Sequence, residues 1–218
     1  HRKSKNQVLY YVIKSNGIKE IENLINNFLN VRNSFVFESV EKGFIKGRYT
    51  IFGKNPDKIW EFNNNNCVLN YGNKRKKLRG TPKDNIEKII ENFNFKIPSE
   101  LPPISSIISG YFSYDTIRYI EKIPNSTKND LKIPDARILR PKNLVVFDNV
   151  KKKLFFIVNC FFDEKIKNYQ IKYDQIQKEI EEMIFLANYS YKINQSKTKI
   201  SKPKVKSNIS KKKFLSNV

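Results

Sequence analysis

The sequence predicts an α+β domain in which antiparallel or mixed strands form a sheet covered by helices. Short apolar or alternating segments, typical of strands, recur over the first 160 residues and are separated by turns rich in Asn, Gly and Pro. Segments with helical spacing of apolar residues interrupt them at 18–29, 82–93 and 166–187. With 218 residues the chain can bury one good-sized core, or one domain and the start of another.

The first elements are a strand, a helix and a hairpin. Residues 8–13 form an apolar and aromatic run typical of a buried strand, and 18–29 have the spacing of an amphipathic helix. Residues 34–40 then alternate between apolar and polar, a charged turn follows at 41–43, and 47–53 are typical of a second strand. We expect this hairpin to present three polar residues near its open face, Glu38, Ser39 and Arg48.

The middle of the chain predicts two more strands, an exposed loop and a helix. Residues 58–62 alternate, 63–66 form a turn, and 67–71 return. The basic run 73–79 predicts a solvated loop. A helix then begins with Thr81 as N-cap, Pro82 at the first helical position and Asp84 near the positive end of the helix dipole, and we expect its buried stripe to comprise Ile86, Ile89, Ile90 and Phe93.

The second half contains the most apolar strands. Residues 107–114 suit a strand in which Gly110 allows another backbone to approach closely, and a short helix follows at 115–121. Residues 144–147 and 154–161 predict a hairpin at the centre of the sheet, because both strands are apolar on both faces. The final helical stripe favours a helix packed on its own sheet, with a coiled-coil dimer as the alternative, and comprises Ile166, Tyr169, Tyr173, Ile176, Ile180, Met183 and Ala187.

The net charge of +21 raises the alternative of a basic nucleic-acid-binding domain. The chain contains 34 Lys, 27 Asn and 28 Ile but only 8 Arg and 2 Ala, the composition that A/T-rich codons impose on any fold. A nucleic-acid surface favours clustered Arg, whereas the Lys residues here are spread along the chain. We therefore expect no nucleic-acid partner.

Several other classes of function are disfavoured. Two Cys residues are too few for a disulfide framework, and a single His, at position 1, leaves no His-based triad or zinc site. No segment is apolar for long enough to span a membrane, no signal peptide is evident, and no phosphate loop or dinucleotide fingerprint occurs. These features predict a cytoplasmic protein without a membrane partner.

An acid, a hydroxyl and a guanidinium at one end of a hairpin have the chemistry to hold an amino acid. The carboxylate of Glu38 could bind an ammonium group, while Ser39 and Arg48 could bind a carboxylate or another polar group. The alternative is a surface salt bridge beside a strand, with no ligand. The residues alone leave both interpretations open.

Two blocks of sequence resemble the amino-terminal domain of anthranilate synthase component I, a family of chorismate-using enzymes. The first block is Phe37-Glu38-Ser39, followed by GRYTIFG at 47–53 and by Pro56. The second is GYFSYD at 110–115 with Arg118, Glu121 and Pro124, followed by Pro134-Asp135 and by NLVVFDN at 143–149. The chain departs from the family just before Gly110, where the family has more glycine and this sequence has Ser105, Ser106 and Ser109.

The resemblance implies a function for the complete protein. Such an enzyme converts chorismate and ammonia to anthranilate and pyruvate, the first committed step of tryptophan synthesis. It uses magnesium, and a glutamine amidotransferase subunit (component II) supplies the ammonia. Tryptophan inhibits it by feedback, and the resemblance places Glu38, Ser39 and Arg48 in the tryptophan pocket. It also implies that the sheet is half of a two-sheet sandwich.

The resemblance also divides the chain into three parts. Residues 1–188 correspond to the regulatory domain, 189–209 form a linker rich in Lys, Ser and Asn, and 210–218 begin the chorismate-binding catalytic domain with Ser210 as a helix N-cap. The catalytic residues and magnesium ligands then lie outside this chain, which we expect to be inactive alone. The alternatives are aminodeoxychorismate synthase component I, of the folate branch, and a free-standing tryptophan sensor.

Overall fold

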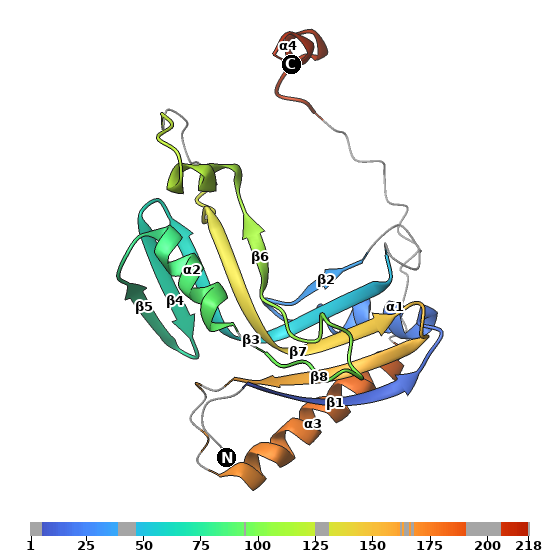
Figure 1. Ribbon diagram of the computed structural model, residues 1–218. Coiled ribbons are helices and arrows are strands. Elements are labelled where there is room, and N and C mark those ends of the chain that lie inside the picture. The colour runs from blue at the N-terminus through green and yellow to red at the C-terminus, as the bar shows by residue number, and fades with distance from the viewer. Residues whose placement is uncertain are drawn as a thin grey trace.

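The computed structural model describes residues 6–38, 47–93, 95–124, 131–161, 163, 166, 168–190 and 206–217. Within them, eight strands form one sheet in which every pair is antiparallel, and the helices at 18–27, 82–92 and 169–188 lie against it (Figure 1). The order is β1 (Gln7–Lys14), α1 (Ile18–Asn27), β2 (Phe35–Phe37), β3 (Tyr49–Asn63), β4 (Asn66–Tyr71), β5 (Lys74–Leu78), α2 (Pro82–Asn92), β6 (Ser109–Phe112), the 3-10 helix η1 (Tyr114–Tyr119), β7 (Ala136–Asp148), β8 (Lys153–Cys160), α3 (Tyr169–Asn188) and α4 (Lys211–Ser216). The predicted α+β class is confirmed.

The two longest strands, β3 and β7, pair along nearly their whole length and divide the sheet into two halves. The first half has the order β1-β8-β7-β3-β2, and the second has β6-β7-β3-β4-β5. The register shifts between Pro56 and Lys58, next to the pairing of Pro56 with Pro141. Because proline has no N–H to donate, the ladder is interrupted there without ending either strand. The two strands predicted at 47–53 and 58–62 are therefore one bulged strand.

Three apolar clusters bury the faces of the sheet. Helices α1 and α3 cover one face of the first half, where Leu24 and Met183 pack with Val158. The segment before β6 covers the opposite face of that half, with Leu101 against Ile157. Helix α2 covers the second half through a cluster of Trp60, Phe62, Cys67, Ile89, Ala136 and Ile138. The hairpin of β7 and β8 contributes to both faces of the first half, as its apolar sequence predicted.

Helix α3 packs on its own sheet, which confirms that interpretation over a coiled-coil seam. Its later stripe residues Ile176, Met183 and Ala187 are buried in the cluster with α1 and β8, whereas Tyr169 and Tyr173 are about half exposed. Two side chains of α1 also cap the carboxyl end of α3. The side-chain amide of Asn23 donates to the carbonyl of Ala187 at 2.8 Å, and that of Asn27 donates to the carbonyls of Leu186 and Tyr189.

Three local predictions were wrong. Residues 8–13 do not form a buried strand, because β1 lies at the edge of the sheet and Tyr10 and Tyr11 are 38% and 53% exposed. The basic run at 73–79 is not a loop, because its centre forms the edge strand β5, which pairs with β4. The first four residues of β5 are cationic and exposed. Ile90 does not belong to the buried stripe of α2, since it is 59% exposed. The N-terminus of α2 is as predicted: the Thr81 hydroxyl accepts from the Asp84 N–H, and the Asp84 carboxylate accepts from the Thr81 N–H.

Further predictions are confirmed at Gly110 and Ser210. A Cβ atom on Gly110 would lie 2.0 Å from the carbonyl oxygen of Arg137 in the neighbouring strand β7, so only glycine permits this close approach. The Ser210 hydroxyl accepts from the Lys213 N–H and caps α4. None of the helices described has the length and apolar character required to cross a lipid bilayer.

Candidate functional site

The predicted hairpin is present and brings Glu38 and Arg48 to the same end of β2 and β3. Phe37, the last residue of β2, pairs with Ile51 of β3. Glu38 directly follows β2 and is exposed, while Arg48 directly precedes β3. Ser39 and the charged turn at 41–43 lie outside the described residues. The assignment of Glu38, Ser39 and Arg48 to a ligand pocket stays a prediction.

Arg48 makes a bidentate ion pair with Asp148 at the end of β7. Its Nε donates to Oδ1 and Oδ2 at 3.1 and 3.2 Å, and its Nη2 donates to Oδ2 at 2.7 Å. The sequence predicts either a bound ligand or a surface salt bridge at these residues, and nothing in it indicates Asp148 as the partner of Arg48. Within the described part of the chain Nη1 makes no hydrogen bond, and the Arg48 side chain is 29% exposed. Among the described residues, Nη1 therefore has no hydrogen-bond acceptor.

The carboxylate of Asp148 is buried, with 1% of its side chain exposed, yet it is held in the ionised form. Burial opposes ionisation, but hydrogen bonds from the Arg48 guanidinium and from the N–H groups of Lys151 and Val150 outweigh it, so the pKa of Asp148 lies below its usual range. The two backbone bonds, both 3.0 Å, close the turn between β7 and β8. Asp148 therefore holds both the Arg48 side chain and the turn between β7 and β8 in place.

Gly53 sets the spacing between the hairpin strands. It pairs with Phe35 of β2, and a Cβ atom at position 53 would lie 2.2 Å from the end of the Phe35 ring. The second glycine of the GRYTIFG segment is thus required by the aromatic side chain that packs over it. This packing holds β2, and with it Glu38, against β3.

The second block of resemblance forms a hydrogen-bonded corner. The Tyr119 hydroxyl donates to Asp135 at 2.9 Å, and the Tyr111 hydroxyl donates to the Pro134 carbonyl at 3.1 Å. Burial, followed by the hydrogen bond to Asp135, raises the pKa of Tyr119. Asp115 pairs with Arg118 at 2.9 Å within the 3-10 helix. The Tyr111 and Tyr119 hydroxyls thus attach β6 and η1 to the two residues that precede β7.

The chain offers no metal centre within its described residues. No group of three or more His, Cys, Asp or Glu side chains lies close enough together there to bind an ion. Magnesium takes oxygen ligands, usually one or two carboxylates together with substrate oxygens and water. We assign magnesium to none of the described residues.

Several known proteins named anthranilate synthase are similar in sequence to this chain. No protein-family model matches the chain. It is 31% identical over 191 residues to anthranilate synthase component 1 of Acetivibrio thermocellus, a match that covers 84% of this chain and 38% of that protein. It is 34% identical over 124 residues to anthranilate synthase component 1 of Cereibacter sphaeroides, covering 55% of this chain and 25% of that protein. The Arabidopsis thaliana anthranilate synthase alpha subunit 2, chloroplastic, is 35% identical over 135 residues, covering 57% of this chain and 22% of that protein.

A solved structure shares the fold. The crystal structure of anthranilate synthase component I from Streptococcus pneumoniae matches with a TM-score of 0.54 and 19% identity, over 77% of this chain and 35% of that one. Fold and hairpin together define an α+β domain with one bulged antiparallel sheet. The chain is homologous to anthranilate synthase component I over most of its length. It matches between a fifth and two fifths of the length of these relatives.

Proposed function

We propose that this chain is the amino-terminal, regulatory part of an anthranilate synthase component I. The observation that carries the proposal is the 31% identity to a protein of that name over 84% of the chain. All three relatives compared bear the anthranilate synthase name, which favours that enzyme over the folate-branch alternative. The complete protein would convert chorismate and ammonia to anthranilate and pyruvate in tryptophan synthesis. We place it in the cytoplasm.

The proposed role of this part is feedback inhibition by L-tryptophan. Glu38 would bind the ammonium group of the inhibitor, Ser39 would make a close hydrogen bond, and Arg48 would bind a polar group of the inhibitor or hold Glu38 in place. The ion pair with Asp148 supports the role of Arg48, because it fixes the guanidinium while leaving one donor atom available. Tryptophan would bind one arrangement of the whole enzyme better than the other and shift the population toward the inactive one.

Catalysis would lie in the remainder of the complete protein. Residues 1–188 would form the regulatory domain, 189–209 the linker, and 210–218 the start of the catalytic domain. Chorismate and magnesium would bind beyond residue 218, and a component II amidotransferase would deliver ammonia. On this proposal the 218-residue chain alone has no synthase activity.

The native gene product tests the enzyme assignment. It is incubated with chorismate, magnesium and an ammonium salt, and the products are separated and identified by mass spectrometry. Anthranilate and pyruvate are the expected products, and the 218-residue chain under the same conditions should give neither. Formation of aminodeoxychorismate, or consumption of no chorismate by the native gene product, would overturn the assignment.

A further inference from the structure

Between its two halves the sheet narrows to the two strands β3 and β7, at residues 54–58 and 140–142. We call these two segments the neck. The neighbouring strands β2 and β8 pair with β3 and β7 on one side of the neck, and β4 and β6 pair with them on the other. None of the strand pairs described for these four strands lies within the neck, so only β3 and β7 carry the sheet from one half to the other.

The backbone ladder is interrupted in the neck. Pro56 pairs with Pro141, and neither proline has an N–H to donate. The register then shifts between Pro56 and Lys58, so Asp57 is the extra residue of the bulge. Backbone hydrogen bonds therefore constrain the angle between the two halves less in the neck than elsewhere along β3 and β7.

Each half also has a core of its own. The cluster under α2, which includes Trp60, buries the second half, and the two clusters on either face of the first half bury that half. Among the described residues, no buried side chain belongs to clusters of both halves. The segment between α2 and β6 also crosses the neck, with Leu101 in a first-half cluster and Ile108 against the second-half cluster. Apolar burial thus stabilises the two halves largely separately.

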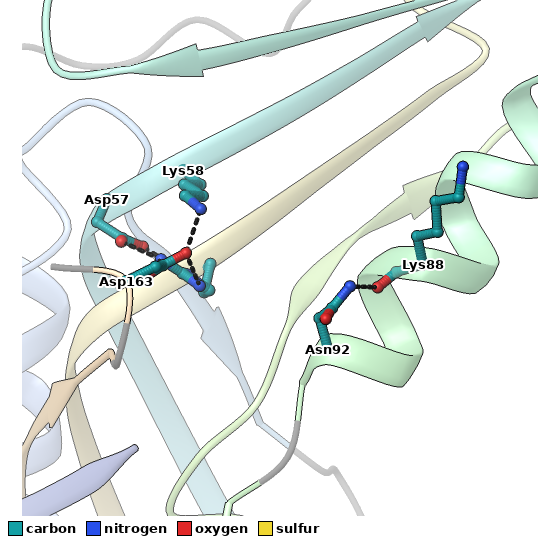
Figure 2. A network of polar contacts seen from close by, with 6 residues as sticks. Asp57, Lys58, Lys88, Asn92 and Asp163 are labelled. Atoms are coloured by element: carbon teal, nitrogen blue, oxygen red, sulfur yellow. Dashed lines mark hydrogen bonds and ion pairs between the residues drawn. The ribbon is translucent and has the colours of Figure 1, made fainter. Parts of the chain in front are cut away.

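Four polar side chains, which we call the Arg140 cluster, join the halves at the neck. The Arg140 side chain is 8% exposed, and its Nε donates to Asp57 at 2.8 Å while its Nη2 donates to Asp163 at 2.8 Å. Lys58, the fourth member, also pairs with Asp163, and Figure 2 shows these two beside Asp57. Asp163 follows β8 of the first half, whereas Lys58 and Arg140 pair with each other where the second half begins. Arg140 therefore holds the bulged residue and bridges the two halves.

Aromatic rings add a second link at the same place. The Arg140 guanidinium lies 3.8 Å from the centre of the Phe161 ring, which follows β8. The Phe161 ring in turn meets the Phe95 ring edge to face, with 5.5 Å between the ring centres. A further bridge between the halves is a single hydrogen bond, from Nη2 of Arg137 to Asn33 at 2.7 Å, and the Arg137 side chain is 24% exposed. Arg140 is thus the most buried and most multiply bonded of these bridging groups.

From this geometry we propose that the neck is a hinge between two cooperative units, and that the Arg140 cluster is the lock that couples them. The hairpin end with Glu38 and Arg48 belongs to the first half, whereas the corner formed by Tyr119 and Asp135 belongs to the second. The lock therefore fixes these two parts of the molecule relative to each other. The inference does not rest on the proposed function, because neither a ligand nor a catalytic group enters it.

Urea unfolding of the 218-residue chain, followed by two probes, tests the coupling. The fluorescence of Trp60, the one tryptophan in the sequence, reports on the core of the second half. Far-ultraviolet circular dichroism reports mainly on the first half, because α1 and α3 have 10 and 20 residues there, while α2 in the second half has 11. Coincident transitions indicate one cooperative unit, and we expect them in the parent.

Two variants break the lock, and a third is the matched control. In Arg140→Met the Trp60 transition should move at least about 0.5 M urea below the circular dichroism transition, since the second half has one apolar cluster and the first has two. Asp163→Asn keeps the contact of Arg140 with Asp57 and should give a smaller separation in the same direction. Arg48→Met breaks the other bidentate pair between β3 and β7, which lies within the first half, so its two transitions should shift together.

Hydrogen exchange without urea gives an independent readout. In Asp163→Asn the amides of β4, β5 and α2 should exchange faster than in the parent, while those of β8 and α3 keep their rates, because the second half opens as a unit. Coincident transitions in Asp163→Asn and in a folded Arg140→Met, or separated transitions already in the parent, would overturn the proposal. An equal separation in Arg48→Met, or equal acceleration of exchange in both halves, would do so as well.

Discussion

The guanidinium of Arg48 and the buried carboxylate of Asp148 form a bidentate ion pair that joins the start of β3 to the end of β7. The two residues are 100 positions apart in the sequence. Each belongs to a different segment of the resemblance, GRYTIFG and NLVVFDN. The pair therefore brings these segments together at the end of the hairpin where Glu38 lies.

Removal of the Arg48 charge should destabilise the domain. Arg48→Met keeps the aliphatic stem but leaves the Asp148 carboxylate buried with only backbone donors, at an expected cost of about 2 kcal/mol in the free energy of unfolding. Urea unfolding followed by circular dichroism measures it. Arg75→Met, on the exposed edge strand β5, is the control and should change stability by less than about 0.5 kcal/mol. Equal effects of the two variants would contradict the structural role of the pair.

Stability should fall in acid, and Asp148 should contribute to the fall. The folded-state pKa values of Asp148 and Asp163 lie below the ordinary value, so both carboxylates stabilise the fold above the unfolded pKa of about 4. This contribution is lost as the pH falls through the lower, folded-state pKa values. Asp148→Asn should be less stable at neutral pH and lose less stability on acidification. Parallel stability curves for the variant and the parent, measured by urea unfolding from pH 7 to pH 3, would exclude this linkage.

The two interstrand glycines should respond differently to alanine. Gly110→Ala meets the Arg137 backbone, which cannot move aside, so a loss of about 3 kcal/mol or more is expected. Gly53→Ala meets only the end of the Phe35 ring. The double variant Gly53→Ala with Phe35→Leu should therefore lose less stability than the two single losses added together. Strict additivity in a double-mutant cycle would refute the clash at Gly53.

Two serines before Gly110 have buried hydroxyls, which is unfavourable for stability when they lack hydrogen-bond partners. The hydroxyls of Ser105 and Ser106 are buried, and neither has a hydrogen-bond partner within the described part of the chain. Ser105 is fully buried, so Ser105→Ala should raise the free energy of unfolding by roughly 1 kcal/mol. Thermal unfolding of the variant gives the sign directly. A lower melting temperature would mean that the hydroxyl is satisfied in solution.

The sequence predicts the elements whose signals are local. The cap at Thr81, the close approach at Gly110 and the central hairpin of β7 and β8 all follow from residues within a few positions of one another. The strand β5 could not be predicted in this way. Its pairing with β4 decides its conformation, and cationic side chains are tolerated because the strand lies at an exposed edge.

Other features depend on contacts between distant residues. Pro56 is typical of a strand end, yet β3 continues beyond it. The register shifts at a bulge beside the Pro56–Pro141 pair, and the pairing with β7 then resumes. The candidate site was predicted as a set of residues at one hairpin end, and Glu38 and Arg48 do lie there. The partner of Arg48 was missed, because nothing local to Arg48 indicates a carboxylate 100 residues away.

Tryptophan inhibition of the native gene product is a direct test of whether this hairpin forms a regulatory site. Anthranilate formation is measured against L-tryptophan concentration for the parent and for Ser39→Phe, with Arg75→Met as the control. We expect tryptophan to inhibit the parent and the control, and Ser39→Phe to relieve inhibition while chorismate turnover stays nearly unchanged. Inhibition of Ser39→Phe at the same tryptophan concentration as the parent would contradict the assignment of this hairpin as the regulatory site.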